Sequence, residues 1–306
     1  MKKKILSVCM AVMMAATVLA GCGGASNDTA SNNAASKETV SDEPASNPVY
    51  VISREDGSGT RGAFIELMGI EQKNEAGEKV DMTIDTAEVT NSTSVMITTV
   101  QGNEAGIGYI SLGSMDDTKV KAIKVDGVEA TVENVKSGAY KVARPFNIAT
   151  KEDISEAAQD FVNFILSTEG QTIVEEKGYI KLDGTESFVS NGATGKVVVG
   201  GSTSVSPVME KLIEGYAAVN AGVEIELQTS DSSTGMSATA DGTLDIGMAS
   251  RELKDSEIEK GLVGTQIAMD GIAVIVNKNN TAVDDLSSEQ IMKIYTGEIT
   301  DWSQIQ

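Results

Sequence analysis

The chain has 306 residues and a formal net charge of −21 at pH 7, from 24 Lys and Arg against 45 Asp and Glu. This acidity argues against nucleic acid as a partner, because binding a phosphate backbone requires a basic face. The sequence contains no histidine, which excludes Ser-His-Asp and Cys-His catalysis and every histidine-based metal site. We expect neither a metal nor another cofactor.

The first residues are typical of a secretory signal. A basic start, Lys2–Lys4, precedes an apolar run, Ile5–Ala20, that is too short to span a bilayer comfortably. The run leads into Leu19–Cys22, where small residues precede a cysteine, as lipoprotein processing requires. We therefore predict a lipoprotein signal peptide over residues 1–21 and a lipid anchor on Cys22. This anchor would hold the protein on the extracytoplasmic face of the cell membrane.

The segment after the signal predicts a tether. The other of the two cysteines, Cys9, lies inside the signal, so the mature chain cannot form an internal disulfide. Residues 22–47 are rich in Ser, Ala, Asn and acidic residues without apolar periodicity, which predicts disorder. The remainder, Pro48–Gln306, is long enough for two lobes of ordinary domain size.

Strand, glycine loop and helix follow the tether. Val49–Ser53 is β-branched and aromatic, Arg54–Thr60 is polar, and apolar residues at helical spacing begin at Ala63. The patterns further along predict two strands and an amphipathic helix, at Ala105–Leu112, Val120–Val125 and Ile154–Leu166.

A second unit begins near Gly195 with the same design. Lys196–Val199 predicts a strand, Gly200–Ser206 a polar loop, and Pro207 opens a helix, since proline suits the first helical turn. Further strands are predicted at Val223–Gln228, Leu244–Met248 and Gly271–Val276, with a Ser-rich loop at Thr229–Gly235. Strands that alternate with helices predict parallel sheets of the α/β class.

Three loops combine a strand end, Gly and Ser or Thr residues, and a helix start: Asp56–Thr60, Gly201–Ser204 and Asp231–Gly235. Free N–H groups and the positive end of the helix dipole suit an oxyanion there. In open α/β sheets, ligands bind at the carboxyl ends of strands. Arg54 can donate two hydrogen bonds to a tetrahedral oxyanion while Asp56 holds its guanidinium, although a surface ion pair is the alternative. One such loop would more often be a helix cap, but three favour an anion site.

Other phosphate and nucleophile motifs are missing. The sequence has no GxxxxGKS or GxxxxGKT loop, no GxGxxG with a downstream acid, and no GxSxG elbow. An enzyme acting on phosphoesters through a loop serine would also lack an activating base. We therefore expect a binding protein and no enzymatic activity.

The loops of the predicted anion site and several neighbouring segments resemble those of a known family. Ser53–Thr60 resembles the RSDGSGT signature of periplasmic phosphate-binding proteins, the receptors of the Pst-type phosphate importer. Ile107–Tyr109 resembles the family's IGY strand, and Gly201–Ser204 and Ser232–Ser233 resemble its two phosphate loops. Asp245–Ser250 resembles its DFGASD strand, and Ile299–Trp302 its ITNW turn. The resemblance implies a two-lobed, periplasmic-binding-protein-like clamp of type II that closes over its ligand.

The resemblance also implies the contacts to phosphate. One lobe would supply Arg54, Ser58, Gly59 and Thr60, and the other Thr203, Ser204 and Ser232. Ser250 stands where the family has the aspartate that accepts the proton of phosphate. Asp270 is our first candidate for the missing acceptor, because it enters an apolar strand, with a solvated turn aspartate as the alternative. Asp56 and Asp231 are the next candidates for this acceptor.

The two halves stand in the reverse of the family's usual order, which predicts a circularly permuted chain. Lobe one would hold residues 48–140 and 276–306, lobe two residues 141–275, and Gln306 would lie close to Pro48. The implied function is capture of inorganic phosphate for an ABC importer, with its permease and ATPase subunits as partners. Alternatives are a receptor for sulfate or arsenate, and a phosphate sensor or adhesin without transport.

Overall fold

The computed structural model describes residues 47–305, so the predicted signal peptide, Cys22 and all of the tether except Asn47 lie outside the described residues. The main strands are β1 (Tyr50–Arg54), β4 (Glu88–Thr90), β5 (Gly106–Ser111), β6 (Val120–Ala122), β8 (Ala143–Thr150), β9 (Gly195–Ser202), β10 (Val223–Ser230), β11 (Ile246–Ala249) and β12 (Val263–Asn277). Two small sheets pair β2 (Glu71–Lys73) with β3 (Lys79–Asp81), and β7 (Lys124–Val125) with β13 (Asp285–Leu286).

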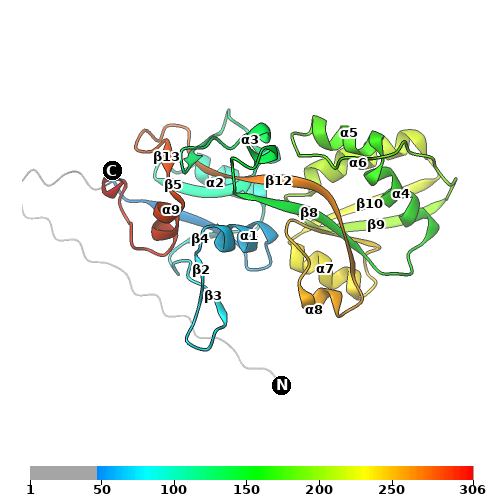
Figure 1. Ribbon diagram of the computed structural model, residues 1–306, viewed down its shortest axis with the longest axis horizontal. Coiled ribbons are helices and arrows are strands. Elements are labelled where there is room, and N and C mark those ends of the chain that lie inside the picture. The colour runs from blue at the N-terminus through cyan, green and yellow to red at the C-terminus, as the bar shows by residue number, and fades with distance from the viewer. Residues whose placement is uncertain (1–46, 306) are drawn as a thin grey trace, which may run out of the picture. The chain divides into compact units, whose positions relative to one another are not determined.

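Helices alternate with these strands (Figure 1). They are α1 (Gly59–Leu67), α2 (Thr93–Gln101), α3 (Val132–Lys136), α4 (Glu156–Leu166), α5 (Thr168–Glu176), α6 (Ser206–Val219), α7 (Ser232–Ala240), α8 (Asp255–Ile258) and α9 (Ser288–Tyr295), with short 3₁₀ turns at Leu112–Ser114 and Trp302–Gln304. Within residues 47–305, no helix is long and apolar enough to cross a bilayer.

One sheet of nine strands runs through the described part of the chain, in the order β10-β9-β11-β8-β12-β5-β1-β4, with β6 beside β12. The α/β class is confirmed. The expectation of purely parallel sheets is wrong, because β12 runs antiparallel to both β8 and β5, and β8 antiparallel to β11. The parallel sets are β1 with β4 and β5, and β9 with β10 and β11, as strand-helix-strand connections require.

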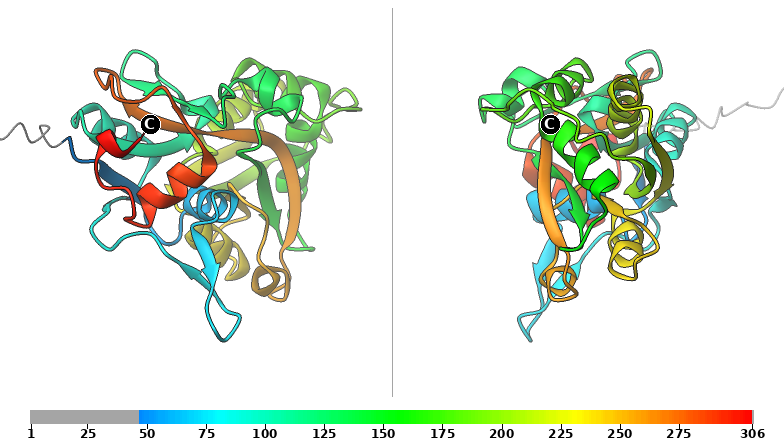
Figure 2. Two further views of the ribbon diagram at one scale, coloured as in Figure 1. Left: turned by 60° about the vertical axis from the view of Figure 1, so that its left-hand side comes forward. Right: turned by 90° about the vertical axis from the view of Figure 1, so that its right-hand side faces the viewer.

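Two large hydrophobic cores hold most of the fold, in addition to two smaller buried clusters. In the first core, Phe64 of α1 stacks on Tyr109 at 4.0 Å and meets the edge of Tyr295 at 5.0 Å, and Figure 2 shows α1 beside α9. In the second core, Tyr216 of α6 packs against Phe161 and Phe164 of α4 at 5.1 and 5.5 Å.

The strands β8 and β12 pass from one core to the other (Figure 1). In β12, Ala268 belongs to the second core and Ile272 to the first, and in β8 Ala143 packs on the first core while Phe146 lies in the second. The predicted lobe boundary at 275/276 therefore falls inside the part of β12 that packs on the first core. Since the run is apolar on both sides of the switch, the sequence does not mark it. The lobe boundaries stay predictions.

Both ends of the described chain lie together at the first core. Pro48 bridges Asp301, the Val49 N–H donates to the Thr300 carbonyl at 2.9 Å, and the Trp302 N–H donates to the Asn47 carbonyl at 2.9 Å. The prediction that the ends meet is confirmed for these residues, while Gln306 itself lies outside the described residues. Circular permutation stays a prediction.

Candidate functional site: a cluster of helix N-termini

Four helices begin directly after a strand of the main sheet. Ser58 caps α1 by accepting a hydrogen bond from the Arg61 N–H at 3.3 Å, Ser92 caps α2, and Asp231 caps α7. The helix α6, which follows β9, instead carries proline in its first turn. Because the first N–H groups of a helix have no partner inside it, each start offers donors to a ligand.

The structure brings these helix starts together. The Arg54 Nη2 donates to the Thr203 Oγ1 at 3.2 Å, and the Ser204 Oγ lies 2.8 Å from the Thr60 Oγ1 and 3.2 Å from the Thr93 Oγ1. Residues predicted to lie in different lobes thus touch. Their contact with an anion stays a prediction.

Glycines allow the close approach of the loops. A Cβ on Gly59 would lie 2.5 Å from the Ser232 Oγ and 2.8 Å from the Ser250 Oγ, and one on Gly57 would lie within van der Waals overlap of the Asp231 carboxylate. The Ser250 N–H in turn donates to the Ser232 Oγ at 3.2 Å. The predicted site residues Gly59, Ser232 and Ser250 therefore form one contact region.

Arg54 is the buried charge of this region, with 2% of its surface exposed. Its Nε and Nη2 donate to the two carboxylate oxygens of Glu55 at 2.8 and 2.7 Å. Its Nη1 is buried and has no hydrogen-bond partner among the described residues. The expectation that Asp56 holds this guanidinium is wrong, because the Asp56 side chain is 96% exposed and pairs with Arg61 at 2.8 Å.

Asp270 lies in a strand, and its side-chain partners also come from strands. It lies in β12 opposite Arg144 of β8, and its carboxylate accepts from the Ser111 Oγ at 2.9 Å and the Arg144 Nη2 at 3.2 Å. Burial raises the pKa of Asp270 to about 6, although Arg144 and Ser111 act to lower it. Its predicted role as the acceptor of a phosphate proton stays a prediction.

Sequence reasoning missed Glu55, Thr93 and Arg144. A capping pattern could have indicated Thr93, because Ser92 precedes a run of apolar residues at helical spacing. Arg144 gave no such signal, because it and Pro145 interrupt the apolar pattern of β8. For Glu55, whose side chain lies beside that of its neighbour Arg54, we find no comparable signal in the sequence.

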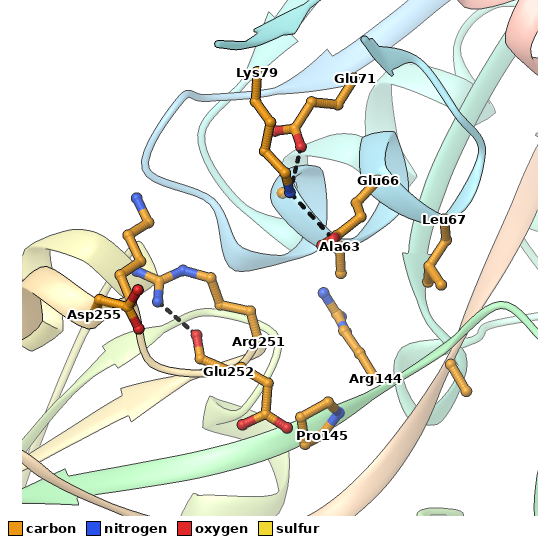
Figure 3. A pocket seen from close by; sticks show the side chains of 13 residues that line it. Ala63, Glu66, Leu67, Glu71, Lys79, Arg144, Pro145, Arg251, Glu252 and Asp255 are labelled. Carbon is orange, nitrogen blue, oxygen red and sulfur yellow. Dashed lines mark hydrogen bonds and ion pairs between the residues drawn. The ribbon is translucent and has the colours of Figure 1, made fainter. Parts of the chain in front are cut away.

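Two clefts flank the contact region. One, of about 570 Å³, lies between α1 and the 251–255 segment (Figure 3), and its lining includes Gly62, Ala63, Lys79, Arg144, Arg251 and Glu252. The other, of about 560 Å³, has Thr93 and Thr203 in its wall. The described residues hold no group of three or more acidic or cysteine side chains arranged to bind a metal ion.

Comparison with known proteins relates this arrangement to a family. A sequence profile described as PBP superfamily domain matches residues 10–169 and 188–306. Phosphate-binding protein PstS 2 of Streptococcus agalactiae serotype V is 53% identical over 306 residues, 99% of each chain. Phosphate-binding protein PstS 2 of Streptococcus pneumoniae serotype 4 is 45% identical over 269 residues, 87% of this chain and 91% of that one.

A crystal structure supports the same relation. The phosphate-binding protein of a phosphate ABC transporter from Streptococcus pneumoniae TIGR4 is 44% identical and superposes with a TM-score of 0.67, covering 85% of this chain and all of that one. The predicted two-lobed periplasmic-binding-protein fold is confirmed. Because the S. agalactiae alignment spans 99% of both chains, the two proteins share the same order of halves. The chain belongs to the PBP superfamily and, within it, to the family of PstS phosphate-binding proteins.

Proposed function

We propose that this chain captures inorganic phosphate outside the cytoplasm and delivers it to the permease and ATPase subunits of an ABC importer. The observation that carries the proposal is the buried guanidinium of Arg54, whose Nη1 finds no partner in residues 47–305. An unpaired donor on a buried charge is costly, so a ligand oxygen is the natural partner. Relatives named as phosphate-binding proteins support the choice of ligand.

The rest of the site suits a tetrahedral oxyanion. Glu55 holds Arg54 through a forked pair with its Nε and Nη2, which leaves the Nη1 for the ligand. Helix starts contribute N–H groups, and hydroxyls come from Ser58, Thr60, Thr203, Ser204 and Ser232. The formal net charge of −21 does not oppose this, because salt screens exposed charges beyond about 8 Å whereas donors in the cleft act at contact distance.

We expect phosphate to be preferred over sulfate by at least about 100-fold, since an unsatisfied buried polar group costs about 1–3 kcal/mol and more if it is charged. Near neutral pH phosphate keeps at least one proton, which an acceptor in the site can receive, whereas sulfate would face that acceptor with a lone pair. Calorimetric titrations with phosphate, arsenate and sulfate measure the preference. Equal affinities for phosphate and sulfate would overturn the phosphate assignment.

The proposal is for binding without turnover. The Ser58 Oγ, the serine hydroxyl of the loop Asp56–Thr60, already accepts the Arg61 N–H as the cap of α1, and the chain has no histidine to activate it. The relatives are likewise named for binding and transport. Hydrolysis of a chromogenic phosphoester that is lost in Ser58→Ala would favour the enzyme alternative.

We further propose that the mature protein is acylated at Cys22, because the apolar run and the small residues before this cysteine form a lipoprotein signal. The expected result is partition into the detergent phase, with Cys22→Ser remaining in the aqueous phase. Mass spectrometry of the mature N-terminus checks the modification. An unmodified Cys22, or cleavage at another position, would contradict this prediction.

A further inference from the structure

A second buried guanidinium lies where the chain crosses between the two cores. Arg144 of β8 is 2% exposed and pairs with Asp270, which is 1% exposed, through its Nη2. Its Nε and Nη1 are buried and have no hydrogen-bond partner in the described part of the chain. An ion pair that satisfied Arg144 completely would leave no such donors, so two N–H directions remain for another group.

The charge of Arg54 acts on Arg144. Burial is the largest cause that lowers the pKa of the Arg144 guanidinium, Asp270 raises it, and the charge of Arg54 lowers it further. Each arginine therefore has one carboxylate partner, Glu55 or Asp270, and each keeps free N–H groups. Like charges in a poorly solvated interior repel, and an anion held by both removes that repulsion.

The side chain of Arg144 points toward α1, the helix that begins at the predicted anion site (Figure 3). Figure 3 shows its side chain pointing from β8 toward Ala63 of α1, and both residues line the cleft of about 570 Å³. The same helix begins at Gly59, in the loop that follows Arg54. Arg144 thus approaches, from the crossover strands, the helix whose start forms the predicted anion site.

We propose that Arg144 is a second anion-binding residue of this site, and that Asp270 and Ser111 are positioning residues that hold its guanidinium toward the ligand. The inference rests on the proposed function, since inorganic phosphate is the anion it would bind. It assigns the Asp270 carboxylate to Arg144 rather than to the proton of phosphate. Arg54 and Arg144 then both donate hydrogen bonds to a doubly charged anion, with each guanidinium oriented by its own carboxylate.

A double-mutant cycle tests this assignment by calorimetric titration with inorganic phosphate. Arg144→Gln alone leaves Asp270 buried without its cation and can impair folding, so the decisive comparison is Asp270→Asn against Arg144→Gln/Asp270→Asn. We expect the double variant to bind phosphate about 10- to 100-fold more weakly than Asp270→Asn, as loss of a charge-assisted contact predicts. Lys151→Gln, which removes a charge from an exposed residue just beyond the end of β8, is the matched control and should bind like wild type.

The outcomes separate the two proposals. If wild type does not bind phosphate, the proposed function fails. If wild type binds but the double variant matches Asp270→Asn within about threefold, Arg144 serves only to neutralise Asp270 and the inference is overturned. Arg144→Lys keeps the positive charge but not the planar guanidinium. Its phosphate affinity therefore tests the inference without the double variant. It should weaken phosphate binding about 10-fold, and wild-type affinity would count against the inference.

Discussion

Arg54→Ala is expected to weaken phosphate binding by about 2–4 kcal/mol, because a charge-assisted contact is lost from a desolvated site. The structure adds a second cause. Glu55 accepts two of the guanidinium's hydrogen bonds, so removing Arg54 leaves a partly buried carboxylate that repels the anion. Calorimetric titration of phosphate measures the loss.

Two further variants sharpen the Arg54 experiment. Arg54→Ala/Glu55→Gln removes the repulsion and should recover part of the lost affinity, which separates the missing contact from the unpaired carboxylate. Lys211→Ala removes the same charge from an exposed pair with Glu214 and should leave binding unchanged. An affinity of Arg54→Ala within about threefold of wild type would place Arg54 outside the binding contacts.

Gly59→Ala is expected to lower phosphate affinity about 10- to 100-fold, because overpacking costs about 1–3 kcal/mol. The added Cβ would lie 2.5 Å from the Ser232 Oγ and 2.8 Å from the Ser250 Oγ, so these two serine side chains must shift away from α1. That movement separates the donors that a closed site brings together.

Gly62 provides a matched control for Gly59. It lies one turn further along α1, and a Cβ placed on it meets no atom within 4 Å. Gly62→Ala should therefore bind phosphate like wild type, and should be slightly more stable because alanine favours helix. Titration and thermal unfolding of both variants make the comparison. Wild-type affinity of Gly59→Ala would mean that the two loops do not need this close approach to bind phosphate.

The local elements follow from patterns that operate over a few residues. The β-branched run at Val49–Ser53, the glycine loop after it and the helical spacing from Ala63 predict β1 and α1 correctly. The strand β8 was missed because Arg144 and Pro145 interrupt its apolar pattern. Its antiparallel pairing with β12 places Arg144 opposite Asp270, which propensity alone does not indicate.

By itself, the sequence determined the α/β class, the helix starts rich in Ser, Thr and Gly, and Arg54 as the candidate anion ligand, since caps, turns and strand runs depend on near neighbours. Only the tertiary structure decided which carboxylate forms an ion pair with which arginine. Spacing favoured Asp56 for Arg54, but the exposed turn directs Asp56 to Arg61. The pair of Arg144 with Asp270 joins residues 126 positions apart, and such a contact depends on the register of two long strands rather than on any local pattern.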